Sequence, residues 1–301
     1  MDFQIELNEE QIKKRKENIE LLKKNELVLY FLDQNNLPLD FIEENSGALL
    51  QWIMCLNQCK NCKGLDYCTQ SIKGKVLKLN IDDFGYLNDC FVSCRYKKRE
   101  EQKMAHQAKF RFSHMSEADY LIDLNDDSFQ GAIRNSDYAQ VYNSVVGSIA
   151  LNKGVYLYGN PGVGKSYLLK GVSNYYAKNG KSVSFVQVPL LIQELKQFMT
   201  DNEYRQNILG HLKFSEVLIL DDIGAESITQ WTRDEILLPV LDQRMNRKLK
   251  TYFTSNYSLE ELEQQYRIAS KMNGNIASLR ILERIRTLSN PIGLTGKSRR
   301  S

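Results

Sequence analysis

Apolar and polar positions divide this chain into two regions with different periodicity. Residues 8–54 have a helical pattern: Asn8 is a suitable cap before Glu9, a highly charged segment runs to Lys24, and apolar side chains gather after it. From residue 155 onward, short apolar runs of strand length alternate with longer helical patterns; these runs are 155–158, 182–188, 217–222, 251–255 and 291–294. This alternation predicts an α/β domain with a parallel sheet, preceded by a small, mainly helical domain.

A glycine-rich loop lies between the first apolar run and a helical pattern that opens at Tyr167. It consists of Gly159, Asn160, Pro161, Gly162, Val163, Gly164, Lys165 and Ser166. Glycines let backbone N–H groups approach a phosphate closely at a helix N-terminus. Lys165 would reach the β- and γ-phosphates, and Ser166 would bind Mg²⁺. The order of strand, loop and helix therefore predicts binding of ATP or GTP.

Two later strands end in polar side chains suited to nucleotide hydrolysis. The run at 217–222 ends in Asp221, which would orient the shell of Mg²⁺, and Asp222, which is placed to polarise an attacking water. A turn or helix cap is the alternative role for this pair. The next run ends at Asn256, a sensor position between the γ-phosphate and the water. Together these residues predict an ATPase of the AAA+ group, and the absence of a guanine-reading Asn-Lys-x-Asp after the loop disfavours a GTPase.

All six cysteines lie in a short stretch, from Cys55 to Cys94. Cys59 and Cys62 have the spacing of a zinc knuckle, and Cys90 and Cys94 could complete a tetrahedral Zn²⁺ site. Cys68 is an alternative fourth ligand. The competing interpretation is a group of buried free thiols. We expect structural zinc, because a stretch with few large aliphatic residues gains much of its folding energy from the metal.

These patterns predict three segments. Residues 1–100 form the helical, cysteine-rich domain, residues 101–128 a linker, and residues 129–301 the ATPase domain. About 136 residues follow Lys165, which is enough for the α/β core but not for a separate helical lid, so we expect oligomerisation to depend on a partner or on DNA. A net charge of +3 does not by itself imply nucleic-acid binding. No apolar run approaches the length of a membrane span, and we expect a cytoplasmic protein without a membrane partner.

Four motifs resemble those of the bacterial replicative helicase loaders of the DnaI primosomal type. They are Leu-Asp-Asp-Ile-Gly-Ala-Glu at 220–226, Trp-Thr-Arg-Asp-Glu at 231–235, Thr-Ser-Asn-Tyr at 254–257 and Ile-Leu-Glu-Arg-Ile-Arg at 281–286. The resemblance covers roughly residues 129–300. It implies an ATP-dependent loader that binds the hexameric replicative DNA helicase and delivers it onto single-stranded DNA during primosome assembly, in replication initiation and restart, together with other primosomal proteins.

The resemblance also implies roles for particular residues. Arg284 would act across a subunit boundary on the γ-phosphate of a neighbour, with Arg280 as a second candidate; both could instead complement a helix C-terminus. The N-terminal domain would dock on the helicase through its zinc-bearing fold. The family pattern has a histidine among the zinc ligands, and this chain departs from it because none lies in the cysteine region.

The segment at 190–214 is a candidate DNA contact because it interleaves basic and aromatic residues such as Lys196 and Phe198. An amphipathic helix pair that covers the sheet is the equal alternative. Two other functions compete with loading. One is a transposition helper ATPase with the same core, and the other is a non-hydrolysing, nucleotide-binding zinc adaptor.

Overall fold

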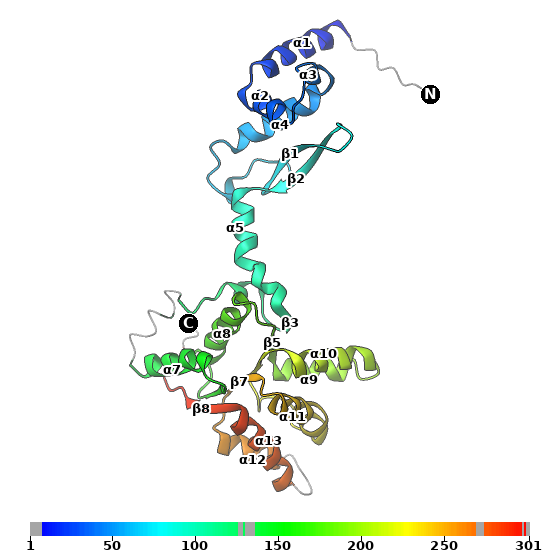
Figure 1. The fold of residues 1–301 in the computed structure, drawn as a ribbon. Coiled ribbons are helices and arrows are strands. Elements are labelled where there is room, and N and C mark those ends of the chain that lie inside the picture. Colours follow the sequence, from blue (N-terminus) through cyan, green and yellow to red (C-terminus); the bar gives the residue numbers. More distant parts are fainter. Residues whose placement is uncertain (1–7, 126–128, 130–135, 269–273, 297, 299–301) are drawn as a thin grey trace. The chain divides into compact units, whose positions relative to one another are not determined.

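The computed structural model describes residues 8–125, 129, 136–268, 274–296 and 298 (Figure 1). It divides the chain into two compact units, Met1–Gln102 and Lys103–Ser301. The boundary falls within α5, Arg95–Met104. Each unit has its own buried core, and each is described separately below.

The first unit combines four helices with a β-hairpin. The helices are α1 (Glu9–Lys23), α2 (Glu26–Gln34), α3 (Phe41–Glu44) and α4 (Ser46–Cys59). A 3-10 turn at Leu65–Tyr67 leads to the antiparallel strands β1 (Lys75–Ile81) and β2 (Leu87–Ser93). Asn8 caps α1 in a capping box with Gln11, as the sequence predicted. The helical prediction for residues 8–54 is confirmed, with breaks at Asn25, at 35–40 and at Asn45.

The second unit is built on a six-stranded parallel sheet. Its strands, in spatial order, are β3 (Phe110–Ser113), β5 (Val183–Gln187), β6 (Val217–Asp221), β7 (Lys250–Ser255), β4 (Gly154–Tyr158) and β8 (Ser289–Gly293). Strand β7 is inserted between β4, which leads into the glycine-rich loop, and β6, which carries the acidic pair. This order brings the carboxyl ends of the three strands that bear candidate site residues next to one another.

Helices cover both faces of this sheet (Figure 1). Side chains of α7 (Ser136–Gly147) and α8 (Lys165–Lys178) share one core with those on one face of the sheet. Those of α9 (Val188–Gln197), α10 (Asn202–Phe214), α11 (Leu238–Asn246), α12 (Leu259–Ile268) and α13 (Gly274–Leu288) share the core on the other face. Short 3-10 turns lie at Ala105–Lys109, Glu117–Leu121 and Ser148–Ala150, and a π-helical segment at Trp231–Leu237 precedes α11.

Strand β6 shows why the sequence gives a buried parallel sheet. All five of its residues are buried, because helices pack on both of its faces. Val217 and Ile219 belong to the core on the α8 side, while Leu218 and Leu220 belong to the core on the α9–α13 side. The continuous apolar run therefore ends with Asp221 at the edge of the sheet, where ligands of such folds bind.

The predicted linker at 101–128 is wrong for most of its length. Strand β3 pairs in parallel with β5, and Tyr120, Ile122 and Leu124 are buried against α8 in the sheet core. Residues from Lys103 onward therefore belong to the second unit. The sequence pattern missed them because a four-residue strand and 3-10 turns carry neither a clear period of two nor one of 3.6.

The end of the chain agrees with the predicted core. Strand β8 pairs with β4 and is the last strand among the described residues, as the run at 291–294 indicated. The described residues after it, 294–296 and 298, form no helical lid. No helix in the described part of the chain has both the length and the apolar character needed to span a membrane.

Candidate nucleotide-binding site

The glycine-rich loop has a backbone that glycine makes possible. Gly159, Gly162 and Gly164 have φ values of 146°, 84° and 104°, in the left-handed region that other residues rarely adopt. At Gly159 a Cβ atom would lie 2.0 Å from the carbonyl oxygen of Leu294. Helix α8 begins directly after Gly164, so its N-terminal N–H groups and the positive end of its dipole meet the loop. The arrangement suits a bound phosphate.

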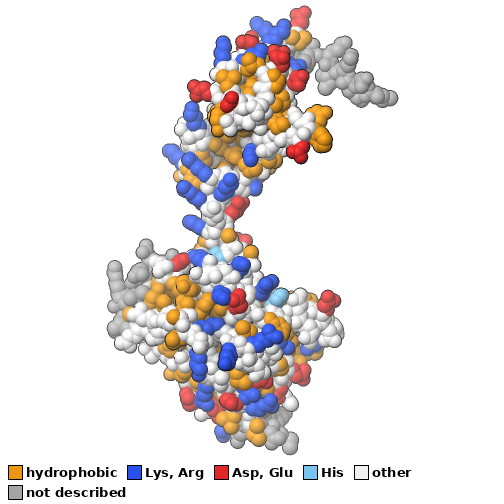
Figure 2. Space-filling model, viewed as in Figure 1, with side chains coloured by type: hydrophobic (Ala, Val, Ile, Leu, Met, Phe, Trp, Pro, Cys, Tyr) orange, Lys and Arg blue, Asp and Glu red, His pale blue; other side chains and the backbone are white. Residues whose placement is uncertain are grey.

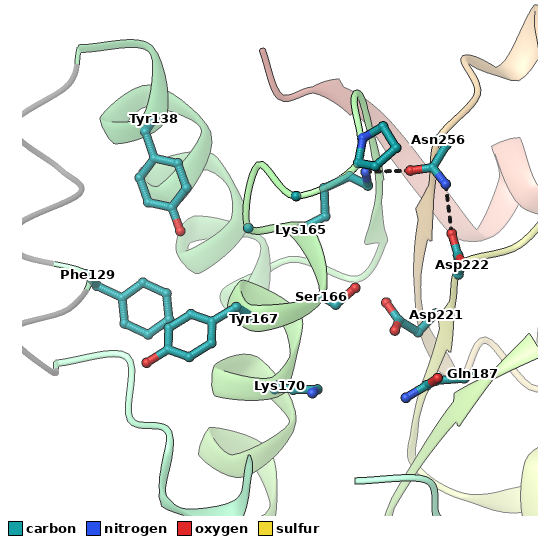
Figure 3. Close-up of a pocket in the computed structure, with 13 residues that line it drawn as sticks. Phe129, Tyr138, Lys165, Ser166, Tyr167, Lys170, Gln187, Asp221, Asp222 and Asn256 are labelled. Atoms are coloured by element: carbon teal, nitrogen blue, oxygen red, sulfur yellow. Dashed lines mark hydrogen bonds between the residues drawn. The ribbon is translucent and has the colours of Figure 1, made fainter. Parts of the chain in front are cut away.

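Lys165 and Asn256 connect this loop to the acidic strand end (Figure 3). The Lys165 ammonium group donates to the carbonyl oxygens of Gly159 and Asn160, at 2.7 and 2.9 Å, and to Oδ1 of Asn256 at 2.9 Å. The Asn256 amide nitrogen donates to Oδ1 of Asp222 at 3.1 Å. Asn256 therefore bridges the lysine and the second carboxylate.

The two carboxylates are held by Thr254 on β7. Its hydroxyl donates to Oδ1 of Asp221 at 2.6 Å and accepts the backbone N–H of Asp222 at 2.8 Å. Asp221 is only 4% exposed, and burial raises its pKa, while hydrogen bonds from Thr254 and Ser166 oppose the rise. Asp222 has a φ of 60°, an uncommon value for an aspartate, so the chain turns sharply between the two side chains. Asp221 thus faces Ser166 while Asp222 faces Asn256.

A cavity of about 650 Å³ joins these groups, which is a size that fits a nucleotide. Its lining residues are Phe129, Tyr138, Pro161, Gly162, Gly164, Lys165, Ser166, Tyr167, Lys170, Gln187, Asp221, Asp222 and Asn256. Five of the eight loop residues and the three polar strand-end residues predicted from the sequence thus line one cavity. Sequence analysis did not identify Phe129, Tyr138, Tyr167, Lys170 or Gln187. Only Gln187 carried a usable signal, since it is the last polar residue of a strand that neighbours β6.

The arginines of α13 do not line this cavity. Nε of Arg284 donates to Oδ1 of Asp242 on α11 at 2.7 Å, and Nη1 donates to Glu283 at 2.6 Å. The Asp242 carboxylate raises the pKa of Arg284, and the side chain is 18% exposed. Arg280 is exposed and lines a separate surface groove with Arg286. Within one chain, therefore, Arg284 takes part in an ion pair between helices.

Four of the six cysteines gather around another cavity, in the first unit. Cys59, Cys62, Cys68 and Cys94 line it, whereas Cys90 is exposed on β2 and accepts a hydrogen bond from Asn80. The expected ligand Cys90 is therefore separated from the cluster, and the alternative ligand Cys68 is part of it. The physical reason is the period of two in a strand, which the sequence spacing alone did not resolve.

Three of these sulfur atoms accept hydrogen bonds from N–H groups. Cys59 accepts from the Gln70 side chain at 3.1 Å, Cys68 from the backbone N–H of Gly74 at 3.3 Å, and Cys94 from that of Lys97 at 3.4 Å. The N–H donors lower the pKa of Cys68, while burial raises that of Cys59. No group of three His, Cys, Asp or Glu side chains in the described residues is arranged so that it could hold a metal ion.

Comparisons with known proteins place this chain in an ATP-binding family. Residues 80–301 match the family described as IstB-like ATP binding protein. The replicative helicase loader DnaI of Bacillus subtilis is 31% identical over 260 residues, which cover 84% of this chain and 81% of the relative. A crystal structure of DnaI aligns with a TM-score of 0.50 at 36% identity, over 65% of this chain and 99% of the other. A putative primosome component from Streptococcus pyogenes aligns with a TM-score of 0.51 at 29% identity, over 65% and 98%. The motif resemblance is thereby confirmed, and the chain belongs to the IstB-like ATP-binding proteins and to the family of the replicative helicase loader DnaI.

Proposed function

We propose that this protein is an ATP-dependent loader that binds the hexameric replicative helicase and delivers it onto single-stranded DNA. The observation that carries the proposal is the convergence of Lys165, Asp221, Asp222 and Asn256 on one nucleotide-sized cavity, in a chain of the DnaI family. We infer that ATP hydrolysis is the switch that ends the loader–helicase complex, and that the core is of the AAA+ class without a separate lid.

The residues of the site divide the work of hydrolysis. The loop N–H groups and Lys165 bind the phosphates, and Asn256 holds the γ-phosphate and the water in line. Ser166 and Asp221 would hold Mg²⁺, which supplies charge neutralisation at the phosphate oxygens. Asp222 accepts the proton of the attacking water. Because Asn256 donates to Asp222, movement of the asparagine toward a γ-phosphate would release the carboxylate for that task.

Arg284 is the candidate for action on the γ-phosphate of a neighbouring subunit. Its ion pair with Asp242 must then open or shift when subunits assemble, which costs free energy and makes hydrolysis depend on the assembly. A solitary subunit, which lacks this contact, should hydrolyse ATP slowly. The same reasoning makes Arg280, which is exposed one helical turn away, the alternative finger.

We propose that the cysteine cluster binds structural zinc, for which the four thiols would have to move closer together, because no three of them are arranged as metal ligands in the described residues. Four thiols from a knuckle, a turn and the residue after β2 line one cavity, and N–H donors point at three of them, as in the outer shell of a thiolate site. We propose Cys59, Cys62, Cys68 and Cys94 as the ligands. Zinc bound there would cross-link α4, the 3-10 turn and the start of α5.

We propose the first unit as the helicase-docking unit. At the tip of its hairpin Phe84 is 86% exposed and Tyr86 71% exposed, and Figure 2 shows the hydrophobic side chains gathered there beside acidic ones. The turn is ordered, because Asp82 accepts hydrogen bonds from the backbone N–H groups of both aromatic residues. An ordered pair of exposed aromatic side chains is an apt anchor for a protein partner.

For DNA we retain α9–α10 as the candidate contact. The structure confirms that this segment is a helix pair with Leu191, Ile192, Leu195 and Leu209 buried against the sheet. Phe198 remains 37% exposed next to Lys196, so the outer side could stack on bases while the inner side covers the core. Substitution of Lys196 or Phe198 should weaken single-strand binding without a loss of stability.

The test is light scattering on the full-length protein with the hexameric helicase of its organism, in ATP and in ADP. A large complex that is lost when residues 1–100 are removed supports loading and assigns docking to the first unit. Absence of a complex in both nucleotides favours the transposition helper ATPase. Complex formation without ATP hydrolysis, in wild type as in Asp222→Asn, favours the zinc adaptor.

A further inference from the structure

His114 completes the hydrogen bonding of β5 with its side chain. Its backbone N–H donates to the carbonyl oxygen of Phe185 at 2.9 Å, which continues the ladder between β3 and β5. Nδ1 of its ring lies 3.1 Å from the backbone nitrogen of Gln187 and accepts that N–H. The His114 side chain therefore holds Gln187, the last residue of β5, at a point where the neighbouring strand β3 has already ended.

This contact determines the direction of a longer chain of hydrogen bonds. A backbone N–H can only donate, so Nδ1 must accept and the neutral ring carries its proton on Nε2. Nε2 lies 3.2 Å from Oε2 of Glu194 on α9 and donates to it. The other oxygen of Glu194 accepts the hydroxyl of Tyr204 on α10. The His114 side chain is 13% exposed and Glu194 25%, so water competes weakly for these bonds.

The two ends of this series of hydrogen bonds lie at different surfaces. At one end, Gln187 lines the nucleotide cavity and is in register with Asp221 on the neighbouring strand, and Figure 3 places its amide beside Asp221 and opposite Lys170. An amide there can both donate to a phosphate oxygen and accept from a water. At the other end, the ring of Tyr204 packs on the exposed Phe198 with centroids 4.6 Å apart.

We propose that Gln187 is a further residue of the ATPase site, and that His114 is a positioning residue that couples this site to the Phe198–Tyr204 surface of α9–α10. The proposal rests on the ATPase proposed above. Displacement of α10 by an occupant of that surface pulls on Glu194, and through His114 it shifts Gln187 relative to Asp221. Conversely, a nucleotide that engages the Gln187 amide stabilises the helix pair.

Steady-state hydrolysis by the full-length protein tests the site end. We expect Gln187→Ala to lower kcat about tenfold and His114→Ala about three- to tenfold, with KM for ATP changed less than about twofold. His114→Asn should retain most of kcat, because its Oδ1 can accept the Gln187 N–H from the place of Nδ1. Tyr204→Phe keeps the packed ring and should lower kcat about threefold. Tyr175→Phe, an exposed tyrosine on α8 outside this chain of bonds, is the matched control and should be unchanged.

Hydrogen exchange tests the coupling without a need for turnover. Addition of a non-hydrolysable ATP analogue should slow exchange in α9–α10 of the wild type, and this change should be lost in His114→Ala and in His114→Asn, which lacks the donor to Glu194. The proposal would be overturned if Gln187→Ala kept the wild-type kcat, or if hydrogen exchange in α9–α10 of the wild type were the same with and without the ATP analogue. A wild type that binds ATP without hydrolysis would refute only the proposed ATPase, and the exchange data would still decide the coupling.

Discussion

Thr254→Val is the sharpest test of how the acidic strand end is built. Valine has almost the shape of threonine, so the core around this 1%-exposed side chain is preserved while its hydroxyl is lost. Two hydrogen bonds disappear, the one donated to Asp221 at 2.6 Å and the one accepted from Asp222 N–H at 2.8 Å. The first involves a carboxylate, and loss of such a bond costs about 1.5–3 kcal/mol. The second leaves a partly buried N–H without this acceptor, which adds about 1 kcal/mol.

The functional effect follows from the pKa of Asp221. Burial raises that pKa and the Thr254 hydroxyl opposes the rise, so valine should raise it further. A carboxyl that keeps its proton to higher pH binds Mg²⁺ less well. We therefore expect a higher half-saturating Mg²⁺ concentration for ATP hydrolysis in Thr254→Val than in wild type, with a difference that grows as pH falls.

The assay is a Mg²⁺ titration of ATP hydrolysis at several pH values, beside urea denaturation of the same samples. Thr254→Ser, which keeps the hydroxyl and loses only a methyl group, is the matched control and should retain the wild-type Mg²⁺ dependence. If Thr254→Val has wild-type stability and wild-type Mg²⁺ dependence, the hydroxyl does not organise the carboxylates and the reasoning is refuted.

Four further predictions concern other parts of the chain. Cys68→Ser should abolish zinc retention and lower the melting temperature of the first unit whereas Cys90→Ser should change neither, as measured by metal analysis and thermal denaturation. Phe84→Ser should weaken helicase binding in light scattering and leave ATP hydrolysis unchanged; equal binding would remove the hairpin from the docking surface. Arg244→Met should destabilise the second unit by about 3–5 kcal/mol in urea, because it leaves two buried backbone carbonyls and one partly buried one without their donor. Because the pKa of Asp221 is raised in the folded state, this group contributes stability at low pH that is lost as pH rises through the raised pKa. The free energy of unfolding of Asp221→Asn should therefore fall less with rising pH than that of wild type. Equal pH dependence of the two proteins would contradict the raised pKa.

The candidate nucleotide site was predictable because its polar residues directly follow recognisable strands in the sequence. The loop at 159–166 and the acidic pair each follow an apolar strand directly, and in a parallel sheet such positions meet at one edge. The same argument placed Asn256 with them. Thr254 was harder to recognise because it acts through two other residues and has no catalytic signature of its own. Phe129 and Tyr138 also line the cavity, but they lie at no fixed sequence distance from the glycine-rich loop, so its motif could not point to them.

The structure separates Cys90 from the other cysteines that the sequence suggested as zinc ligands, and the reason is a different one. Cysteine spacing identifies a knuckle such as Cys59 and Cys62, but it cannot tell which of several later thiols returns to it. That choice depends on the hairpin register, which pairs Cys90 with Lys78 and leaves the Cys90 side chain exposed. Cys94 lies beyond the end of β2, where the chain turns into α5 and the period of two no longer applies.

The misplaced linker has the largest consequence for function. Strand β3 adds an edge to the sheet beside β5, and the residue after it, His114, supplies the acceptor that ends β5 at Gln187. Were residues 101–128 a flexible linker, neither Gln187 nor Glu194 would have this partner, and the nucleotide site would have no hydrogen-bonded path to the surface of α10. In the coupling that we propose, the segment with the weakest sequence pattern thus determines whether the nucleotide cavity and the helix pair can influence each other. A protein from which residues 1–128 are removed should retain the loop and both carboxylates. Hydrogen exchange in its α9–α10 should no longer differ between the free and the nucleotide-bound form.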